Sequence, residues 1–376
     1  MPQNVFAGRG GMKKLELFRL WGIKRLAVFT DRGVRDAGLL EEVLVTLRGQ
    51  GTEVSVIDNI PAEPSYLEVQ EAADEFFALE AEGIVAVGGG SVMDTAKLVS
   101  ILSHKTVSVK ELLDRPSAGE KRIKTIMIPT TAGTGAEATP NSIVAVPEKA
   151  LKVGIVNEEM IADGVILDGA MLKSLPKHVA AASGIDALAH ALECYTSKKA
   201  TPFSDLYALE ALKLIHGNLV QACEDQDAQE AKQAMLLAAF YGGVAITASG
   251  TTAVHALSYP LGGRYHIPHG TANAMLLGPV MNYNEPCIRP LLANVYDRLW
   301  EGGRAEMETE KSAEVLRWLA EIIRRLEIPE HLSAYGIGKG DLDSLVDASL
   351  SVRRLLDNNR RDISAEAAAK IYLEIM

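Results

Sequence analysis

The spacing of apolar residues changes partway along this 376-residue chain, and that change restricts the fold more than any other sequence feature. In the first half, short apolar runs alternate with segments in which apolar residues recur every three or four positions. Strands are predicted at residues 25–30, 54–58, 83–88 and 124–129, helices at 38–48 and 66–79, and a β-hairpin at 142–146 and 152–156. This alternation is typical of a parallel sheet with helices on its faces.

Beyond about residue 178 the strand pattern disappears and helical periodicity dominates. Helices are predicted at residues 180–195, 204–216, 228–247 and 310–326. A chain of this length has room for two domains with a core each. We therefore expect an α/β domain over residues 1–177 and an all-helical domain over residues 178–376, with the boundary near Pro176 and the active site in the cleft between them.

Composition argues against several classes of partner. Hydrophobic residues make up 48% of the chain and charged residues 23%, an ordinary balance for a soluble globular protein. The formal net charge of -11 argues against nucleic acid or an anionic membrane as a partner, because both need clustered Lys and Arg. Residues 1–11 show no signal-peptide pattern, and the longest apolar stretches, such as 234–246, are predicted to be too short and interrupted to span a bilayer. Cys194, Cys223 and Cys287 are scattered and are expected to be reduced thiols of a cytoplasmic protein.

Three consecutive glycines end one predicted strand. Gly88, Gly89 and Gly90 are followed by Ser91 and by a helix predicted to begin near Val92. Glycine lets a backbone approach a pyrophosphate closely, and a helix N-terminus offers free N–H groups to an anion. A tight turn between strand and helix would need the same glycines, and the pattern is not the Gly-x-Gly-x-x-Gly of ordinary Rossmann domains. From the loop alone, both interpretations remain open.

Two further polar segments follow predicted strands. The hydroxyl-rich loop 129–135 suits hydrogen bonds to phosphate and ribose, and a simple polar turn is the equal alternative. Asp31 closes the first predicted strand. A carboxylate there can accept hydrogen bonds from the ribose hydroxyls of NAD and would repel the 2′-phosphate of NADP, so Asp31 favours NAD. The alternative for Asp31 is the N-cap of a helix.

Four residues of the second half carry the atoms of a metal site. Asp186 and His190 lie four residues apart on a predicted helix and therefore point the same way. His255 lies on a second helical segment, and His269 lies in a loop preceded by Pro268. Together they offer three neutral nitrogens and one carboxylate, which can hold a divalent transition metal and leave one position open for a substrate. The alternative is four unrelated polar residues.

The order and length of these motifs resemble the iron-containing (group III) alcohol dehydrogenases. The resemblance rests on GGGSVMDTAK at residues 88–97, PTTAGTG at 129–135, DALAHALE at 186–193 and PHG at 268–270. It extends over nearly the whole chain and implies the dehydroquinate synthase-like fold, with a dinucleotide-binding domain followed by a metal-binding catalytic domain. It also implies an enzyme that passes hydride from a small alcohol to NAD, or in reverse reduces an aldehyde or ketone.

The resemblance assigns roles to individual residues. It makes Asp186, His190, His255 and His269 the metal ligands, with Fe²⁺ as the typical ion, and such a set also accepts Zn²⁺. Besides Asp31, it assigns cofactor contacts to Gly89, Gly90, Ser91, Asp94, Thr130, Thr131, Thr134, Asn141 and Lys152. It further implies a homo-oligomer, a dimer or larger. Glu193 is either a residue that orients a metal ligand or an ordinary Glu of a helix surface.

The chain departs from the family at three positions. Tyr259 stands where relatives often carry a His four residues after the third ligand, and Glu63 stands where they often carry Asn. His266, three residues before His269, is an additional histidine. We expect proton transfer to depend on His266, on Tyr259 or on water, and a hydrogen-bonded structural role is the alternative for His266. These polar replacements favour a substrate with a second polar group, such as a diol, hydroxy acid or hydroxyaldehyde.

Other functions fit parts of the pattern. A dehydroquinate synthase-like lyase on the same fold would need several basic residues around a phosphate-bearing substrate, and Arg264 is the only Lys or Arg of segment 255–269. A zinc glycerol dehydrogenase-like enzyme would use a smaller ligand set. A catalytically silent binding protein would be expected to have lost ligands, and all four are present. We therefore expect a metal-dependent, NAD-linked alcohol dehydrogenase.

Overall fold

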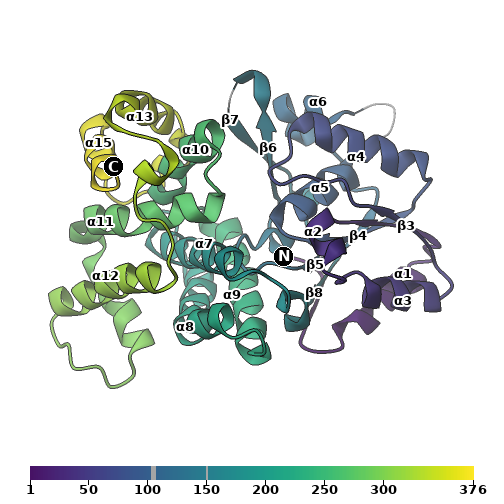
Figure 1. Ribbon diagram of the computed structural model, residues 1–376, viewed down its shortest axis with the longest axis horizontal. Coiled ribbons are helices and arrows are strands. Elements are labelled where there is room, and N and C mark those ends of the chain that lie inside the picture. The colour runs from purple at the N-terminus through teal and green to yellow at the C-terminus, as the bar shows by residue number, and fades with distance from the viewer. Residues whose placement is uncertain (103–106, 150) are drawn as a thin grey trace. The chain divides into compact units, whose positions relative to one another are not determined.

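The computed structural model describes residues 1–102, 107–149 and 151–376. The chain divides into two units. The N-terminal unit comprises Met1–Thr131 and Gly135–Leu175, and the helical unit comprises Pro176–Met376 together with Ala132–Thr134. Within the described residues, all strands belong to the first unit, as Figure 1 shows. The predicted fold class, an α/β region followed by a helical one, is confirmed.

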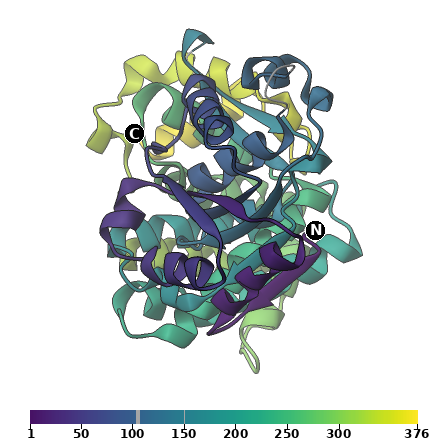
Figure 2. The ribbon, with the colours of Figure 1, turned by 90° about the vertical axis from the view of Figure 1, so that its right-hand side faces the viewer.

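A six-stranded parallel sheet forms the centre of the N-terminal unit (Figure 2). Its strands are β1 (Asn4–Ala7), β2 (Arg25–Phe29), β3 (Glu53–Ile57), β4 (Gly83–Gly88), β5 (Lys124–Pro129) and β8 (Gly164–Leu167). They lie in the order β1-β8-β5-β4-β2-β3, and every neighbouring pair is parallel. Because parallel strands need crossover connections, helices cover both faces of the sheet.

The register brings the predicted cofactor segments to one edge of this sheet. Gly88 at the end of β4 lies beside Pro129 at the end of β5. Phe29 at the end of β2 lies beside Ala86 of β4. The chain leaves these three carboxyl ends into Asp31, the glycine loop and the loop 129–135. Ligands of open α/β sheets bind outside the carboxyl ends of the strands, at the point where the strand order reverses.

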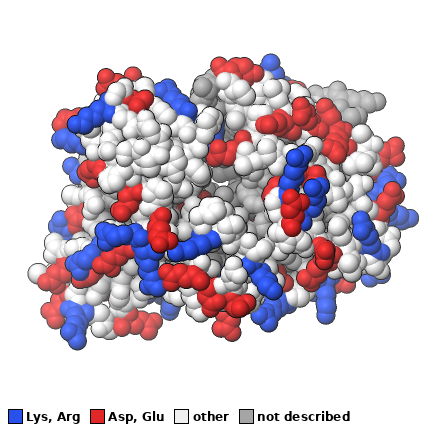
Figure 3. All heavy atoms as spheres, in the orientation of Figure 1, with Lys and Arg blue, Asp and Glu red and all other residues white. Residues whose placement is uncertain are grey.

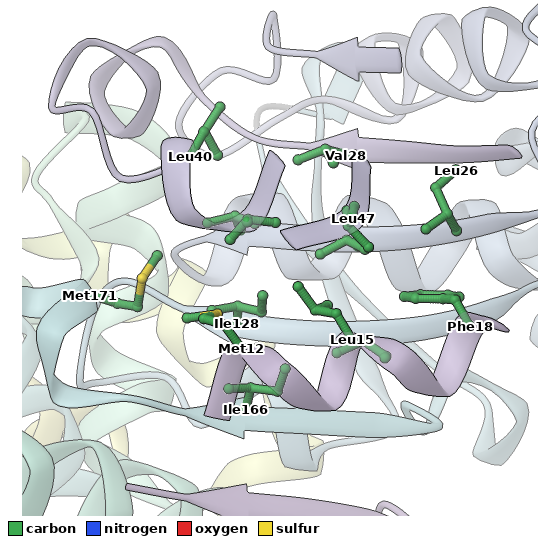
Figure 4. Close-up of a cluster of buried hydrophobic side chains, with 14 of the residues drawn as sticks. Met12, Leu15, Phe18, Leu26, Val28, Leu40, Leu47, Ile128, Ile166 and Met171 are labelled. Carbon is green, nitrogen blue, oxygen red and sulfur yellow. The ribbon is translucent and has the colours of Figure 1, made fainter. Parts of the chain in front are cut away.

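One face of the sheet is covered by the first helical turns of the chain. These are η1 (Gly11–Glu16), α1 (Leu17–Leu20), α2 (Arg32–Asp36) and α3 (Glu41–Gly49). Leu26 and Val28 of β2 point to this face together, because side chains alternate along a strand. Figure 4 shows Leu15, Phe18 and Leu47 packed against the same face, all of them fully buried. Each large apolar side chain buried here contributes about 1.5–3 kcal/mol to stability.

The other face carries α4 (Tyr66–Ala78) and α5 (Gly90–Ile101), and α6 (Val109–Asp114) packs on α4. α4 begins with a capping box, in which Ser65 accepts from the Glu68 N–H and Glu68 accepts from the Ser65 N–H. α5 follows the glycine loop directly and is buried along almost its whole length. The glycine loop and the helix that it opens are therefore fixed parts of the core.

A buried lysine ties α5 to the segment beyond the loop 129–135. The Lys97 side chain is fully buried, and its ammonium pairs with Asp94 Oδ1 at 2.8 Å. The same ammonium donates to the carbonyl oxygens of Ala136, at 2.9 Å, and of Asn141. Asp94 in turn accepts from the backbone N–H of Ile143 at 2.9 Å. A buried charge needs such partners, so Asp94 and Lys97 act as a structural clamp.

The predicted hairpin is present, as β6 (Asn141–Val146) paired antiparallel with β7 (Leu151–Val156). β1 and β8 were not predicted, because four residues are too few to show a period. Short helical turns complete the unit: η2 (Pro116–Ala118), η3 (Ala136–Ala138), η4 (Pro147–Lys149), η5 (Glu158–Met160) and η6 (Gly169–Leu172).

The second unit is built from helices. They are α7 (Lys177–Thr196), α8 (Pro202–Glu224), α9 (Gln229–Ser249), α10 (Ala253–Tyr265), α11 (His269–Leu299), α12 (Glu308–Arg325), η7 (Leu332–Tyr335), η8 (Lys339–Asp341), α13 (Leu342–Leu350), α14 (Arg353–Leu356) and α15 (Ala365–Glu374). The four helices predicted in this half are confirmed as α7, α8, α9 and α12. α10 is the helical segment predicted around His255, although the sequence did not give its bounds. α11 was not predicted, because Pro279, Pro286 and Pro290 interrupt it.

One helix corrects the expectation about apolar stretches. By length and composition, α9 is long and apolar enough to cross a membrane. Its most apolar window is 61% buried inside the protein, where α9 packs against α7 and α8. A core helix passes the same test, so this signal is weak. On the face drawn in Figure 3, a short run of basic side chains is bordered by acidic ones.

Glu137 is an unusual residue of the N-terminal core. Its side chain is 2% exposed, and Oε1 has no hydrogen-bond partner among the described residues. Burial raises the pKa of this carboxyl to about 7, although the Lys97 charge opposes the shift. An ionised Glu137 therefore destabilises the folded protein.

Replacing Glu137 by Gln should remove a pH dependence of stability. The pKa of about 7 in the folded state lies above the ordinary value of 4.5, so the folded protein keeps a proton that the unfolded chain releases. The free energy of unfolding of the wild type should therefore fall, relative to Glu137→Gln, by up to about 3 kcal/mol as the pH rises from about 4.5 to 7. Urea denaturation of both proteins at pH 5 and pH 8 measures this. The prediction is contradicted if the wild type and Glu137→Gln differ in free energy of unfolding by the same amount at both pH values.

Candidate functional site

One face of α7 presents three chemically active side chains. Asp186, His190 and Glu193 lie at positions i, i+4 and i+7 of this helix and therefore share a face. Every residue from Gly184 to Thr196 is buried, so this face lies inside the helical unit. Buried charges are kept only where partners compensate them, and all three residues have such partners.

The predicted ligands converge around one oxygen, Oδ1 of Asp186. This atom lies 3.6 Å from His255 Nε2, 3.6 Å from His269 Nε2 and 3.9 Å from His190 Nε2. The ligand atoms of Asp186, His255 and His269 all lie within 4.8 Å of one another. Ligands about 2.0–2.2 Å from one tetrahedral ion lie roughly 3.3–3.6 Å apart, so this spacing fits a single divalent metal.

His190 contacts the group of Asp186, His255 and His269 mainly through the ring of His255. Its ring stacks on that of His255, with centroids 4.5 Å apart, and the two Nε2 atoms lie 2.9 Å from each other. His190 Nδ1 lies 3.3 Å from the carbonyl oxygen of Gly133, to which it can donate. If both imidazoles are neutral and donate through Nδ1, both Nε2 atoms carry lone pairs toward the same point. A cation between them is the partner that this arrangement fits.

Glu193 holds the other side of His255. Its Oε2 contacts His255 Nδ1, which fixes the proton on Nδ1 and leaves Nε2 as the ligating nitrogen. Its Oε1 accepts from the backbone N–H groups of Thr252, at 3.1 Å, and Val254, at 2.7 Å. These N–H groups begin α10, where a carboxylate is favourable. Glu193 therefore caps the helix that carries His255 and orients its ring, so it is not an ordinary surface Glu.

The charges of the cluster shift its pKa values in consistent directions. Burial alone would raise the pKa of Asp186, but the charges of His190 and His269 lower it far below its ordinary value. Burial likewise opposes the shift at Glu193, whose pKa is lowered by His255. At His255, burial is outweighed by the Glu193 charge and by Asp186, and the pKa is raised to about 9. This position therefore favours a positive charge, which a metal ion on Nε2 would supply in place of a second proton. Burial lowers the pKa of His190. Both carboxylates are therefore ionised at neutral pH.

His269 does not lie in a loop, as predicted, but is the first residue of α11, with Pro268 as the N-cap. The glycine after it is required by packing, because a Cβ on Gly270 would lie 2.2 Å from the carbonyl oxygen of Ala182. The His269 side chain is 33% exposed, against 3% for Asp186 and 3% for His255. His269 is therefore the most solvent-accessible residue of the cluster. The ring of Tyr259 lies beside it, with centroids 6.3 Å apart.

A second layer of contacts supports Glu193 and His190. Asn358 donates to the carbonyl oxygen of Thr251 at 3.0 Å, next to the backbone that binds Glu193. Gly250 adopts a φ of +69°, which favours glycine. A Cβ on Gly133 would lie 2.7 Å from the carbonyl oxygen of Ser183, so glycine is needed there for the loop to pack on α7. The sequence indicated neither the Asn358 bond to Thr251 nor the close packing of Gly133 on α7.

Several of the predicted cofactor residues lie at the carboxyl edge of the N-terminal sheet. α5 begins at the glycine loop with Gly89 as its N-cap, and no side chain among the described residues caps it. Its first N–H groups are thus available to an anion. A Cβ on Gly89 would lie 3.3 Å from Thr131 Oγ1, which shows how closely the two loops approach. Thr130 is 3% exposed, and its N–H donates to the Gly88 carbonyl.

Several predicted cofactor residues have structural partners as well. Asp31 caps α2 by accepting from the Val34 N–H at 2.9 Å, which was the alternative interpretation. Lys152 is 12% exposed and pairs with Glu63 at 2.6 Å, so it is not a solvated hairpin lysine. The Glu63 N–H donates to Ser91 Oγ at 2.9 Å. Glu63 therefore joins the lysine of the hairpin to the start of α5.

His266 ends α10 in the left-handed conformation, with a φ of +55°, and its side chain is exposed. Left-handed backbone is uncommon for a residue other than glycine, so His266 has at least a conformational role as the C-cap.

Thr134 belongs to the short segment that counts with the helical unit. Asn141 begins β6, and its carbonyl oxygen is one of the acceptors of Lys97.

Both units match models of one family. Residues 2–169 match the model described as "Iron-containing alcohol dehydrogenase", and residues 180–376 match the model described as "Fe-containing alcohol dehydrogenase family, C-terminal". The resemblance inferred from the motifs is thereby confirmed, and the lyase alternative is not favoured.

Individual relatives extend over nearly the whole chain. Long-chain-alcohol dehydrogenase 1 of Geobacillus thermodenitrificans (strain NG80-2) is 34% identical over 364 residues, which cover 94% of this chain and 90% of that protein. Choline dehydrogenase of Bacillus subtilis (strain 168) is 32% identical over 377 residues, which cover 99% of this chain and 93% of that protein. The crystal structure of a 1,3-propanediol oxidoreductase has a TM-score of 0.93 at 28% identity and covers 100% of this chain and 98% of that chain.

Proposed function

Because this chain belongs to the iron-containing alcohol dehydrogenase family, we propose that it is a metal-dependent, NAD-linked oxidoreductase that interconverts a small alcohol with its aldehyde or ketone. The observation that carries the proposal is the buried convergence of three imidazole nitrogens on Asp186 Oδ1. A family member without catalysis would have no need to keep so many charged groups buried.

The proposed metal ligands are Asp186, His190, His255 and His269. A divalent ion held there, Fe²⁺ or alternatively Zn²⁺, supplies Lewis acidity toward the hydroxyl of a substrate. Asp186 contributes negative charge at the centre of the cluster, and Glu193 keeps His255 in the tautomer that ligates through Nε2. The partial exposure of His269 leaves that side of the cluster open to a small molecule.

We propose the carboxyl edge of the N-terminal sheet as the cofactor site. NAD held there would supply the acceptor for the hydride of the carbinol carbon. The uncapped start of α5, with Gly89, Gly90 and Ser91, suits the pyrophosphate. Thr130, Thr131, Thr134, Asp94, Asn141 and Lys152 remain the other proposed contacts. The cap at Asp31 uses Oδ1, and a carboxylate has further lone pairs for ribose hydroxyls.

Proton release is assigned to Tyr259 or His266. Tyr259 lies beside the partly exposed ligand His269, so its hydroxyl is one candidate for the relay. His266 is exposed, and an imidazole can both donate and accept a proton, so it is the other candidate. The polar character of both residues favours a substrate with a second polar group, such as a diol or a hydroxy acid.

We further propose a homo-oligomer that works in the cytoplasm. Its cysteines Cys194, Cys223 and Cys287 are all free thiols, which suits a reducing compartment. β1 forms one edge of the sheet, and sheet edges are common sites of association. Light scattering after size exclusion would measure the oligomeric state.

Replacing His269 by Ala should remove bound metal and nearly all turnover. The protein should stay folded and still bind NADH, because the proposed cofactor contacts lie mostly in the N-terminal unit. His269 is the cleanest ligand to replace, since His255→Ala also leaves the buried Glu193 without its partner. Metal content, circular dichroism and NADH fluorescence measure these outcomes.

The matched control is His331→Ala, which removes an exposed histidine of the same unit and should keep both metal and activity. Full activity of a metal-free His269→Ala protein would refute the assignment of the ligands.

Asp31→Gly should relax the preference for NAD over NADP. The carboxylate would meet the 2′-phosphate with like charge, and about 1.4 kcal/mol of repulsion at a partly exposed site corresponds to a factor of about 10 in the ratio of kcat/KM values. Glycine is accepted at helix N-caps at a loss of a few tenths of a kcal/mol, so the variant should fold.

Ser364→Gly, which removes the N-cap of α15, controls for the loss of a cap. A wild-type preference for NADP would show that Asp31 is a capping residue alone.

His266→Asn should lower kcat by about 10²-fold if His266 relays the proton, the usual scale for one acid–base group. Asn is the suitable replacement because it tolerates the left-handed backbone at this position. The pH profile of alcohol oxidation should flatten near neutrality while metal content stays intact. Tyr259→Phe is the parallel test for the hydroxyl. An unchanged profile in His266→Asn would leave His266 with the structural role alone.

A further inference from the structure

One buried side chain touches the proposed metal centre without being a predicted ligand. Asn273 lies on α11, one turn after His269, and is fully buried. Its Nδ2 donates to Asp186 Oδ1 at 2.7 Å. The same nitrogen lies 3.2 Å from His255 Nε2 and 3.2 Å from His269 Nε2. A single amide group thus contacts three of the four ligand atoms.

The chemistry of these neighbours fixes the orientation of the amide. A carboxylate oxygen only accepts hydrogen bonds, and Asp186 Oδ1, at 2.7 Å, is the nearest of the three neighbours. The NH₂ of Asn273 can donate to this acceptor, whereas its carbonyl oxygen in the same place would oppose the Asp186 charge. The NH₂ group therefore faces the ligand atoms.

The buried position of Asn273 has a free-energy cost, and a role at the metal centre accounts for it. Asn273 Oδ1 is buried and has no hydrogen-bond partner among the described residues. Leaving a buried acceptor unsatisfied is unfavourable, and an apolar residue of the same size, such as Leu, would avoid it. The favourable term that asparagine adds here is the hydrogen bond to Asp186.

We propose that Asn273 is a positioning residue of the metal centre, which holds the ligating oxygen of Asp186 in place and thereby strengthens metal binding. This inference rests on the proposed ligand set. A carboxylate oxygen has two lone pairs, so Asp186 Oδ1 can accept from Asn273 with one and bind a cation with the other. Because His269 and Asn273 share one helix turn, α11 supplies a ligand and the residue that orients another ligand.

The test compares Zn²⁺ binding by the metal-free wild type and by Asn273→Leu, measured by competition with a chromogenic chelator. The dissociation constant of the variant should rise by about 10- to 100-fold, the usual effect of losing a group that orients a metal ligand. The visible spectrum of the Co²⁺ form should also change, because the geometry at Asp186 loosens. Asn273→Gln keeps an amide on a longer side chain and should restore part of the affinity.

Asn284→Leu is the matched control. Asn284 is a buried asparagine of the same helix that exchanges amide hydrogen bonds of 2.8 Å with Asn359. This variant should lose stability but keep the wild-type affinity for Zn²⁺ and the Co²⁺ spectrum. A merely structural role of Asn273 would give the same result for both leucine variants.

The outcomes separate the two proposals. A wild-type chain that binds no Zn²⁺ would overturn the ligand set and this inference with it. A wild-type chain that binds Zn²⁺ no more tightly than Asn273→Leu would overturn the role of Asn273 alone. If Asn273→Leu does not fold, Asn273→Ser is measured in its place, since its hydroxyl is too short to replace the amide. Failure of both variants to fold would make Asn273 a core residue and overturn the positioning role.

Discussion

The contact between Glu193 and His255 is the interaction on which the helical unit depends most. A fully buried carboxylate must find several donors, and Glu193 finds them in the first N–H groups of α10 and in the imidazole of His255. The same charge therefore starts a helix, sets its position against α7 and selects the nitrogen that His255 offers to a metal. The Glu193 carboxylate thus serves both the local fold and the orientation of a proposed metal ligand.

Backbone contacts set the remaining geometry. α7 is approached on one side by Gly133 and on another by Gly270, and any side chain at either position would meet the α7 backbone. The Gly133 carbonyl faces His190, and Gly270 follows His269, so each close approach lies directly beside a ligand. Tight backbone packing thus limits how far the ligands can shift, which is what a metal centre with preorganised ligands requires.

The sequence predicted the parts of the fold whose residues repeat a clear period. Strands such as β2 and β4 and helices such as α4 and α12 were predicted within a few residues, since burial on one side leaves a readable pattern. α11 escaped prediction because its internal prolines resemble a loop, although the surrounding contacts tolerate them. For Glu193 the sequence left two roles open, because α7 is buried on all sides there and no polar face showed where that residue points. Asn273 escaped prediction because a neutral amide belongs to no ligand pattern.

The bond from Asn358 to Thr251 has a consequence for the order in which the protein is made. The loop that binds Glu193 is held by a residue that the ribosome adds long after all four proposed ligands. Until that residue is available, the hydrogen bond that holds the Thr251 carbonyl is missing. The proposed metal centre therefore depends on the C-terminal part of the chain as well as on the segments that carry its ligands.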